Sequence, residues 1–294
     1  MASVAKYSRA AIGNLFAHME RRQKPDKDGK MEYVKFGNRE IDTRYTPLNY
    51  RVWPPLDAKT TEMRNIYVSE ATQETWEQLQ LNPEEPALAR FRRIYKNTPH
   101  ANRKDLKCLC DWCISLPDEI PVDRMDELWD VCIRYCCRLY GVENIVGAWV
   151  HVDEAHRPHL DVAFVPVIGE GDNRRICARD LIKRKHLSDW HGGLSAMIQE
   201  EMGLENPGIL NGRTKAQGGN RTVAQMKAAD KKYEKTKGRE VAQWRSEQLK
   251  RLERAARHGG VVLLDNMLTD AKTRQNEPLK EPRKKTLGEM LQGR

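Results

Sequence analysis

The sequence lacks any long hydrophobic run. Its longest apolar stretches, Ile145 to Val150 and Ala163 to Ile168, are far shorter than the roughly 20 residues that a membrane-spanning helix needs. Near the N-terminus, Lys6 and Arg9 interrupt the apolar core that a signal peptide would require. We therefore expect a cytoplasmic protein that does not insert into a membrane.

The cysteines do not have the pattern of a disulfide framework. Their number, seven, is odd, and their spacing is not that of small secreted scaffolds, so a reducing compartment fits better. Two groups, within 108–113 and 132–137, fall in segments that we predict to be helical. Free cysteine in such positions packs as a small hydrophobe. We favour packing, with a structural zinc site as the alternative.

Positive charge is concentrated at one end of the chain. The 294 residues carry a formal charge of +9, and residues 211–294 hold 21 Lys and Arg against 10 Asp and Glu. The preceding 210 residues hold 30 against 32, so all the excess lies in the last part. A basic segment on a near-neutral core is typical of attraction to nucleic acid. The alternative is a charged helix whose charge only keeps it solvated.

Length, hydrophobic periodicity and glycine content suggest two parts. A length of 294 residues with 39% hydrophobic content predicts about two domains, with at least one buried core. We expect a compact domain over 1–210, a Gly-rich linker over 211–220 and a basic helical arm over 221–294 with a disordered end. A thin apolar stripe on the arm makes homodimerisation an alternative role for it; the stripe comprises Val241, Trp244 and Leu252. The predicted elements are helices over 8–22, 61–81, 103–116, 124–140, 181–202 and 222–257, and strands over 145–152 and 158–168.

Three of the eight histidines fall in one window, at the turn between the two predicted strands. Side chains alternate along a strand, so His159 and Asp161 share a face, and antiparallel pairing brings His151 beside them. Nitrogen and oxygen donors without a thiolate suit Mn²⁺ or Mg²⁺ better than Zn²⁺. Glu154 and His156 lie in the turn, where a supporting or proton-transfer role suits them better than metal ligation. The alternative is a polar surface turn without a function.

The same window carries a family resemblance. His151 to Asp161 resembles the motif His-x-Asp-Glu-x-x-Pro-His-x-His of the Mob/Pre (MobV-type) relaxases, which are plasmid mobilisation and recombination enzymes, with Asp161 at the place of the last histidine. Ala17 to Arg21 is similar to the family's N-terminal His-x-Glu-Arg motif, and Thr46 to Tyr50 to its Leu-Asn-Tyr motif. Together with less distinctive segments, the resemblance covers roughly residues 1–225.

The resemblance implies a fold and a reaction. The fold is α+β, an antiparallel sheet flanked by helices. The reaction is a strand-specific nick at a plasmid transfer origin that leaves the protein joined to the 5′ phosphate. The implied nucleophile is His18, with Tyr45 and Tyr50 as rivals because other relaxases use tyrosine. The implied partners are origin DNA, single-stranded or supercoiled, and a coupling protein with its secretion machinery.

Physical chemistry assigns roles around His18. If the helix continues to Arg22, then Arg21 and Arg22 lie one turn after His18, where both would hold the scissile phosphate. Glu154 would orient His18 or accept its proton. The predicted DNA contacts are Arg22, Arg44, Asn49 and Tyr50, the last two through hydrogen bonding and base stacking.

Two other functions compete with this one. A non-catalytic plasmid repressor or accessory protein would use only the basic arm. A mononuclear iron oxygenase would use His151 and Asp153 with a second histidine. In such sites the second histidine comes from a distant strand, whereas His159 is only eight residues away. We therefore favour the nicking enzyme.

Overall fold

The computed structural model describes most of the chain before residue 210 and a helix after it. The chain has two compact units, Met1–Ala242 and Gln243–Arg294. The predicted helix at 61–81, the Gly-rich linker and the end of the arm lie outside the described residues. Those residues are 2–25, 27–33, 41–53, 85–154, 157–209, 228, 232–233, 235 and 237–257.

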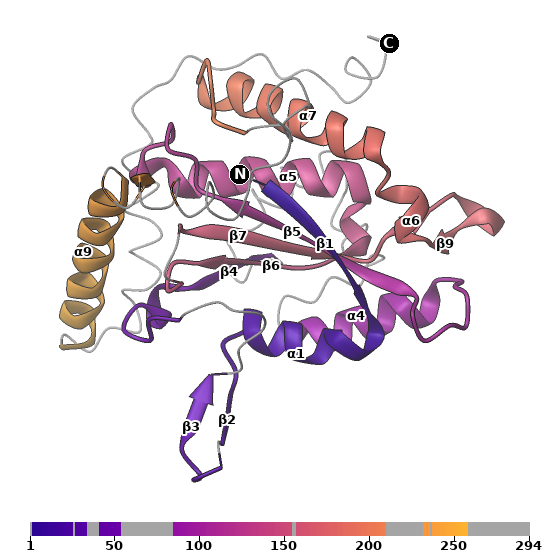
Figure 1. Cartoon of the computed structure of the whole chain (residues 1–294), viewed down its shortest axis with the longest axis horizontal. Helices are drawn as coiled ribbons and strands as arrows, with labels where there is room; N and C mark the ends of the chain where they lie inside the picture. The colour runs from indigo at the N-terminus through magenta and orange to yellow at the C-terminus, as the bar shows by residue number, and fades with distance from the viewer. Residues whose placement is uncertain are drawn as a thin grey trace. The chain divides into compact units, whose positions relative to one another are not determined.

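A five-stranded antiparallel sheet forms the centre of the first unit (Figure 1), with strand order β1-β5-β7-β6-β4. Its central strand β7 and the neighbouring β6 form the predicted hairpin, which is confirmed. β7 ends earlier than predicted because Pro166 cannot donate a ladder hydrogen bond. The sheet strands are β1 Ala2–Ser8, β4 Tyr50–Trp53, β5 Lys107–Ser115, β6 Ile145–His151 and β7 His159–Phe164.

Helices cover both faces of this sheet, so the expected α+β architecture is confirmed (Figure 1). Helices α1 (Arg9–Met19) and α4 (Ala87–Asn97) pack on one face, and α5 (Met125–Tyr140) and α7 (Arg184–Met202) on the other. The predicted ends of α5 and α7 are confirmed, because Gly141 and Gly203 follow with φ of 80° and 66°. Smaller elements are β2 Gln23–Pro25, β3 Met31–Tyr33, η1 Thr46–Leu48, η2 Val122–Arg124, η3 Val142–Asn144, β8 Val167–Ile168, η4 Gly171–Asn173, β9 Arg175–Ile176 and α6 Ala178–Leu181.

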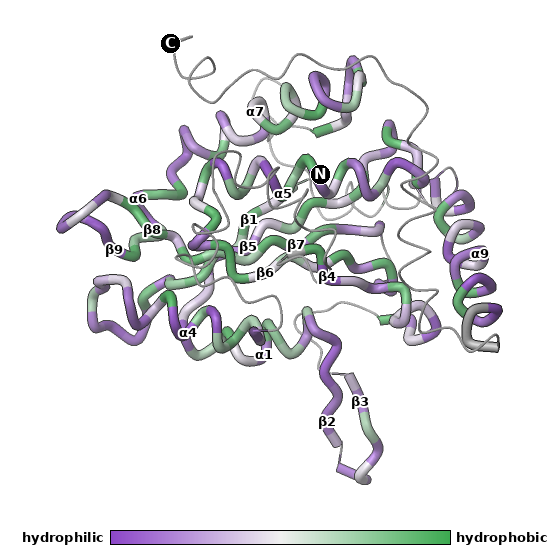
Figure 2. Tube along the Cα trace, turned by 180° about the vertical axis from the view of Figure 1, so that it is seen from behind, coloured by the Kyte–Doolittle hydropathy of each residue, from purple (hydrophilic) through white to green (hydrophobic). Residues whose placement is uncertain are grey.

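Aromatic stacking joins the sheet to α5 and α7. Trp112 of β5 stacks on Trp190 at 3.6 Å between ring centroids, and its Nε1 donates to the hydroxyl of Tyr140 at 2.8 Å. The ring of Tyr140 stacks on Phe164 of β7. The central strands are mainly hydrophobic, whereas the helices carry many hydrophilic residues among their hydrophobic ones (Figure 2). The face of β7 that carries Phe164 is therefore buried against α5.

One predicted helix in this unit is wrong. Residues 103–116, predicted as a helix, contain strand β5, which pairs with β1 and β7 and is buried on both faces. Apolar residues on both faces erase the alternation that would have marked a strand. Residues Gln23–Pro25 form β2, which pairs with β3 in a small two-stranded ribbon. Burial raises the pKa of Cys108 to about 11 and that of Cys110 to about 12, as fits packed thiols.

The C-terminal helix α9 spans Lys237–Arg257 and crosses from the first unit into the second. Its first turns pack in the first unit: Val241 is 1% exposed, and the carboxylate of Glu240 accepts the backbone N–H of Val122 at 2.8 Å. The ring of Tyr233 lies under the guanidinium of Arg157 at 3.8 Å. Val241 is therefore buried within the chain and does not belong to an exposed dimerisation stripe. No helix among the described residues is long and apolar enough to cross a membrane.

Candidate active site

The candidate site lies on the sheet face that α1 covers. His159 and Asp161 project from β7, and the register places His151 of β6 directly opposite His159. On the other side of β7, Cys113 of β5 is the partner of Asp161. The strand pattern thus brings His151, His159 and Asp161 to one face, as the alternation predicts.

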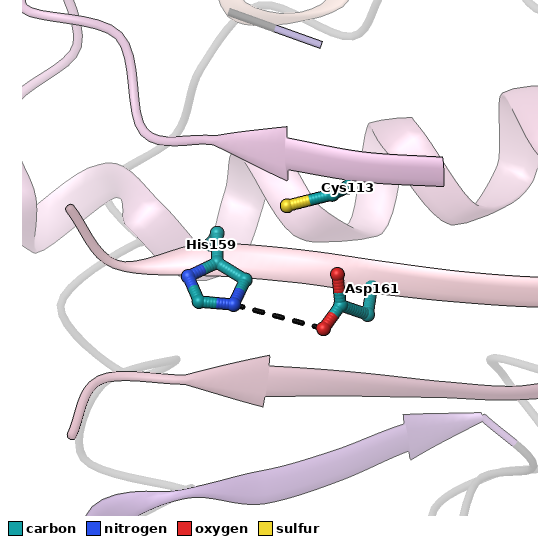
Figure 3. A group of neighbouring side chains, drawn as sticks. All are labelled: Cys113, His159 and Asp161. Atoms are coloured by element: carbon teal, nitrogen blue, oxygen red, sulfur yellow. Dashed lines mark ion pairs between the residues drawn. The ribbon is translucent and has the colours of Figure 1, made fainter. Parts of the chain in front are cut away.

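Asp161 holds the two imidazoles in place. Its Oδ2 lies 3.1 Å from His151 Nδ1 and 3.6 Å from His159 Nε2, the second contact being drawn in Figure 3. Burial opposes the carboxylate charge, but the two histidines outweigh it and lower the pKa of Asp161 well below its usual range. Burial lowers the pKa of His151. Asp161 is therefore an anion between two histidines.

Helix α1 carries His18 into this cluster. His18 is 1% exposed, and its Nε2 lies 3.2 Å from Oε1 of Glu154, just after the end of β6. The same carboxylate oxygen lies 3.9 Å from Nε2 of His159. Ring centroids of His18 and His151 are 6.1 Å apart. The structure thus brings together the N-terminal histidine and the strand histidines, with Glu154 between them.

Arg21 occupies a different position from the one predicted. Helix α1 ends at Met19, and Arg21 turns back with φ of 50°, so the expected helix to Arg22 is wrong. Arg21 donates to both oxygens of Asp153, at 2.9 and 2.7 Å, and to Glu154 at 3.0 Å. Burial opposes its charge, but the two carboxylates outweigh that and raise the pKa of Arg21. Arg22 is half-exposed and pairs with Glu20, so the two arginines do not form one phosphate clamp.

Asp153 is a site residue that the sequence predicted only for the competing iron oxygenase. It is fully buried and accepts hydrogen bonds from Arg21 and, at 2.9 Å, from the hydroxyl of Thr46. Burial disfavours its charge, but the arginine outweighs this and lowers the pKa of Asp153. β6 ends at His151, so strand alternation no longer governs where Asp153 points. The signal in the sequence was its place in the His-x-Asp-Glu motif.

The predicted DNA-contacting residues are dispersed. Oδ1 of Asn49 accepts the backbone N–H of Val152 at 2.8 Å, which fixes the end of β6. The hydroxyl of Tyr50 donates to Asp126 of α5, on the opposite face of the sheet, and burial with this carboxylate raises the pKa of Tyr50 well above its usual range. Arg44 is exposed and pairs with Asp42. Tyr50 therefore lies outside the histidine cluster.

The donor geometry fits a divalent ion. Among the described residues, two groups offer ligand atoms that all lie within 4.8 Å of one another: His151, Glu154 and His159, and Cys113, His159 and Asp161. Metal–ligand distances of about 2.0–2.6 Å allow donors on one ion to be up to about 5 Å apart. Glu154, expected in a supporting role, lies in the first group, while Asp161 falls in the second. The loop is also one residue longer than the family motif, since residues 155–157 separate Glu154 from the proline.

An antiparallel sheet between helix layers, with histidines and carboxylates gathered on one face, is an α+β fold of the relaxase type. The chain is similar to a manganese-bound crystal structure of the MobM relaxase domain (MOBV; Mob_Pre) with plasmid pMV158 oriT DNA, at 18% identity and a TM-score of 0.50. The match covers 78% of this chain and 98% of that one. A second manganese-bound structure of that domain, with a 3′-thiophosphate oriT DNA, is 20% identical over 78% of this chain and 97% of that one, with a TM-score of 0.49.

The family model described as plasmid recombination enzyme, Mob_Pre, matches residues 58–228, more than half of the chain. The chain therefore belongs to this family, and the resemblance seen in the sequence is confirmed. The comparison with curated proteins finds no match. The family match begins after the segment that carries His18, so the contacts of His18 in the structure supply independent support for including it in the site.

Proposed function

We propose that this protein nicks one strand of DNA at a plasmid transfer origin and becomes joined to the 5′ phosphate of the cut strand. The observation that carries the proposal is the contact of His18 Nε2 with Glu154 Oε1, 3.2 Å, beside the buried histidine pair. Membership in the family and the origin DNA bound to the MobM domain support the substrate class. We propose plasmid mobilisation, with transfer through a coupling protein, on the family resemblance.

The chain's own residues can perform the transesterification. His18 Nε2 attacks the phosphorus, an N–P bond forms, and the bond from phosphorus to the 3′ oxygen breaks, leaving a 3′ hydroxyl once that oxygen gains a proton. Glu154 is within hydrogen-bond distance to take the proton from Nε2 before the attack, which frees the lone pair that bonds to phosphorus. Arg21, held by Asp153, fixes Glu154 and brings its Nη1 within 3.4 Å of the same nitrogen. The pair Arg21–Asp153 thus positions the nucleophile and its base.

We propose that His151, Glu154 and His159 hold a divalent ion, Mn²⁺ or Mg²⁺. One carboxylate and two imidazoles are ligands that suit such ions. A bound ion would supply Lewis-acid polarisation of the non-bridging phosphate oxygens. Manganese in the MobM structures supports this choice.

Removal of the metal tests this assignment. EDTA should abolish nicking of a supercoiled origin plasmid, and added Mn²⁺ should restore it, because the histidine cluster needs an ion to bind the scissile phosphate. Agarose gels separate open-circular from supercoiled plasmid. If the protein binds the same DNA but does not nick it with any added metal, the result would instead support the alternative function, a non-catalytic DNA-binding protein. Full nicking in EDTA would remove the metal from the proposal.

We propose that the basic arm supplies DNA affinity and that the compact domain selects the nick site. Truncation after Ala242 keeps the docked residues Glu240 and Val241 and removes the part of α9 that belongs to the second unit. The truncated protein should bind origin DNA more weakly, with a flatter dependence on salt, because fewer counterions are released. The cleavage position should stay the same. An unchanged salt slope together with a dimer becoming a monomer, measured by sedimentation, would make the arm an assembly element.

A further inference from the structure

Cys113 of strand β5 lies beside the proposed metal centre. The register pairs Cys113 of β5 with Asp161 of β7, and Figure 3 shows its thiol turned toward the space between Asp161 and His159. Its Sγ belongs with ligand atoms of both residues in a group that spans no more than 4.8 Å. The thiol is half-buried, unlike the thiols of Cys108 and Cys110 on the same strand. Three strong metal donors of different chemistry therefore meet at this point.

His159 is common to both donor groups, and it can serve only one ion. Its Nδ1 lies 3.1 Å from the carbonyl oxygen of Arg157, to which it donates, and this fixes the tautomer. The lone pair is then on Nε2, which faces Glu154 on one side and Asp161 on the other. An ion that takes Nε2 together with Cys113 withdraws His159 from His151 and Glu154. The two groups are mutually exclusive.

The two groups select different ions. A thiolate, an imidazole and a carboxylate suit Zn²⁺, and N/O/S sites bind Zn²⁺ more tightly than Mn²⁺. Zinc binding would deprotonate the thiol and release the proton to solvent. The thiolate and the Asp161 carboxylate together neutralise Zn²⁺, so the zinc-loaded group carries no net charge. An ion held by Glu154 as the single carboxylate keeps one positive charge, which attracts a phosphate.

We propose that Cys113, His159 and Asp161 form a zinc-selective inhibitory site that competes for His159 with the activating ion. The inference rests on the proposed function, since inhibition requires that the activating ion use His159. It predicts that Zn²⁺ binds more tightly than Mn²⁺ yet supports no nicking. The zinc-bound protein would therefore not bind a phosphate in the site.

Cobalt spectroscopy on the full-length protein tests the thiolate directly. Co²⁺ should give a sulfur-to-metal charge-transfer band in the wild type and in a Cys177→Ser control, whose half-buried thiol contacts Asp180 instead. Cys113→Ser should lose the band. A band that persists in Cys113→Ser, or is absent from the wild type, would overturn the inference.

Calorimetry separates this inference from the proposed function. Cys113→Ser should weaken Zn²⁺ binding by roughly tenfold or more, with Mn²⁺ binding retained, and it should relieve the inhibition of Mn²⁺-supported nicking by Zn²⁺. His159→Ala should weaken the binding of both ions. If His159→Ala weakens Mn²⁺ binding but Cys113→Ser leaves Zn²⁺ binding unchanged, only the zinc site is wrong. If His159→Ala affects neither ion, the metal centre of the proposed function is wrong as well.

Discussion

Replacing His18 by alanine should abolish the covalent protein–DNA adduct and lower the nicking rate by at least on the order of 10⁴-fold, the scale seen when a nucleophile is removed. The imidazole is buried, and its Nε2 is the ring nitrogen that meets Glu154. Origin DNA should still bind, because the exposed basic groups are untouched. Incubation with a single-stranded origin oligonucleotide followed by mass spectrometry measures the adduct, and a gel shift measures binding.

Two tyrosines provide the matched controls. Tyr50→Phe should retain the adduct, because the Tyr50 hydroxyl donates to Asp126 on the opposite face of the sheet. Tyr45→Phe should retain it as well, since the ring of Tyr45 lies against Arg44, which is exposed. The adduct should be released by brief acid, because a phosphoramidate is more acid-labile than a phosphotyrosine. An acid-stable adduct that persists in His18→Ala and disappears with either tyrosine change would reassign the nucleophile.

The strands around the site were predictable where one face is polar. In the window from His151 to Asp161 the polar residues recur at strand spacing, so both the hairpin and the meeting of His151 with His159 follow from sequence. β5 was misread because it is buried on both faces between β1 and β7. Only the three-dimensional pairing shows that Cys113 lies next to Asp161. The sequence alone therefore could not predict the second group of metal donors, which is Cys113 with His159 and Asp161.

The end of α1 was the other unpredictable feature. Helical spacing after His18 placed Arg21 and Arg22 together, but a buried arginine with two carboxylates beside it is more favourable than one more exposed helical turn. That choice depends on Asp153 and Glu154, which are more than 130 residues away along the chain. Local periodicity contains no information about such a partner. The contact between His18 and Glu154 was anticipated from the family motif together with the proton-accepting chemistry of a carboxylate.

Replacing Arg21 by alanine should destabilise the protein by about 3–5 kcal/mol, because it leaves Asp153 as a buried charge without its cation. It should also lower nicking, since Arg21 contacts both Glu154 and the backbone of His18. Arg21→Lys keeps the charge but loses the bidentate hydrogen bond to Asp153, so it should recover only part of the lost stability and part of the lost nicking activity. Urea unfolding measures the first effect, and the nicking assay the second.

The double variant Arg21→Met with Asp153→Leu separates stability from positioning. Replacing both members of a buried ion pair by apolar residues is often neutral for stability, so this protein should recover most of the stability that Arg21→Ala loses while nicking stays impaired. The remaining loss reflects Glu154, which also loses its contact with Arg21. Recovery of nicking along with stability would show that the pair acts only in folding and does not position His18 or Glu154.

The stability from the ion pair should depend on pH with a fixed sign. The folded-state pKa of Asp153 is lowered, so its contribution is present above the unfolded value of about 4 and is lost as pH falls through the folded value. The wild type should therefore lose stability below about pH 4 more steeply than the double variant. Asp161, whose pKa is also lowered, is common to both proteins, so the difference between the two curves reports on the two carboxylates that Arg21 contacts, Asp153 and Glu154. Parallel curves would mean that the Arg21–Asp153 contact contributes no net stability.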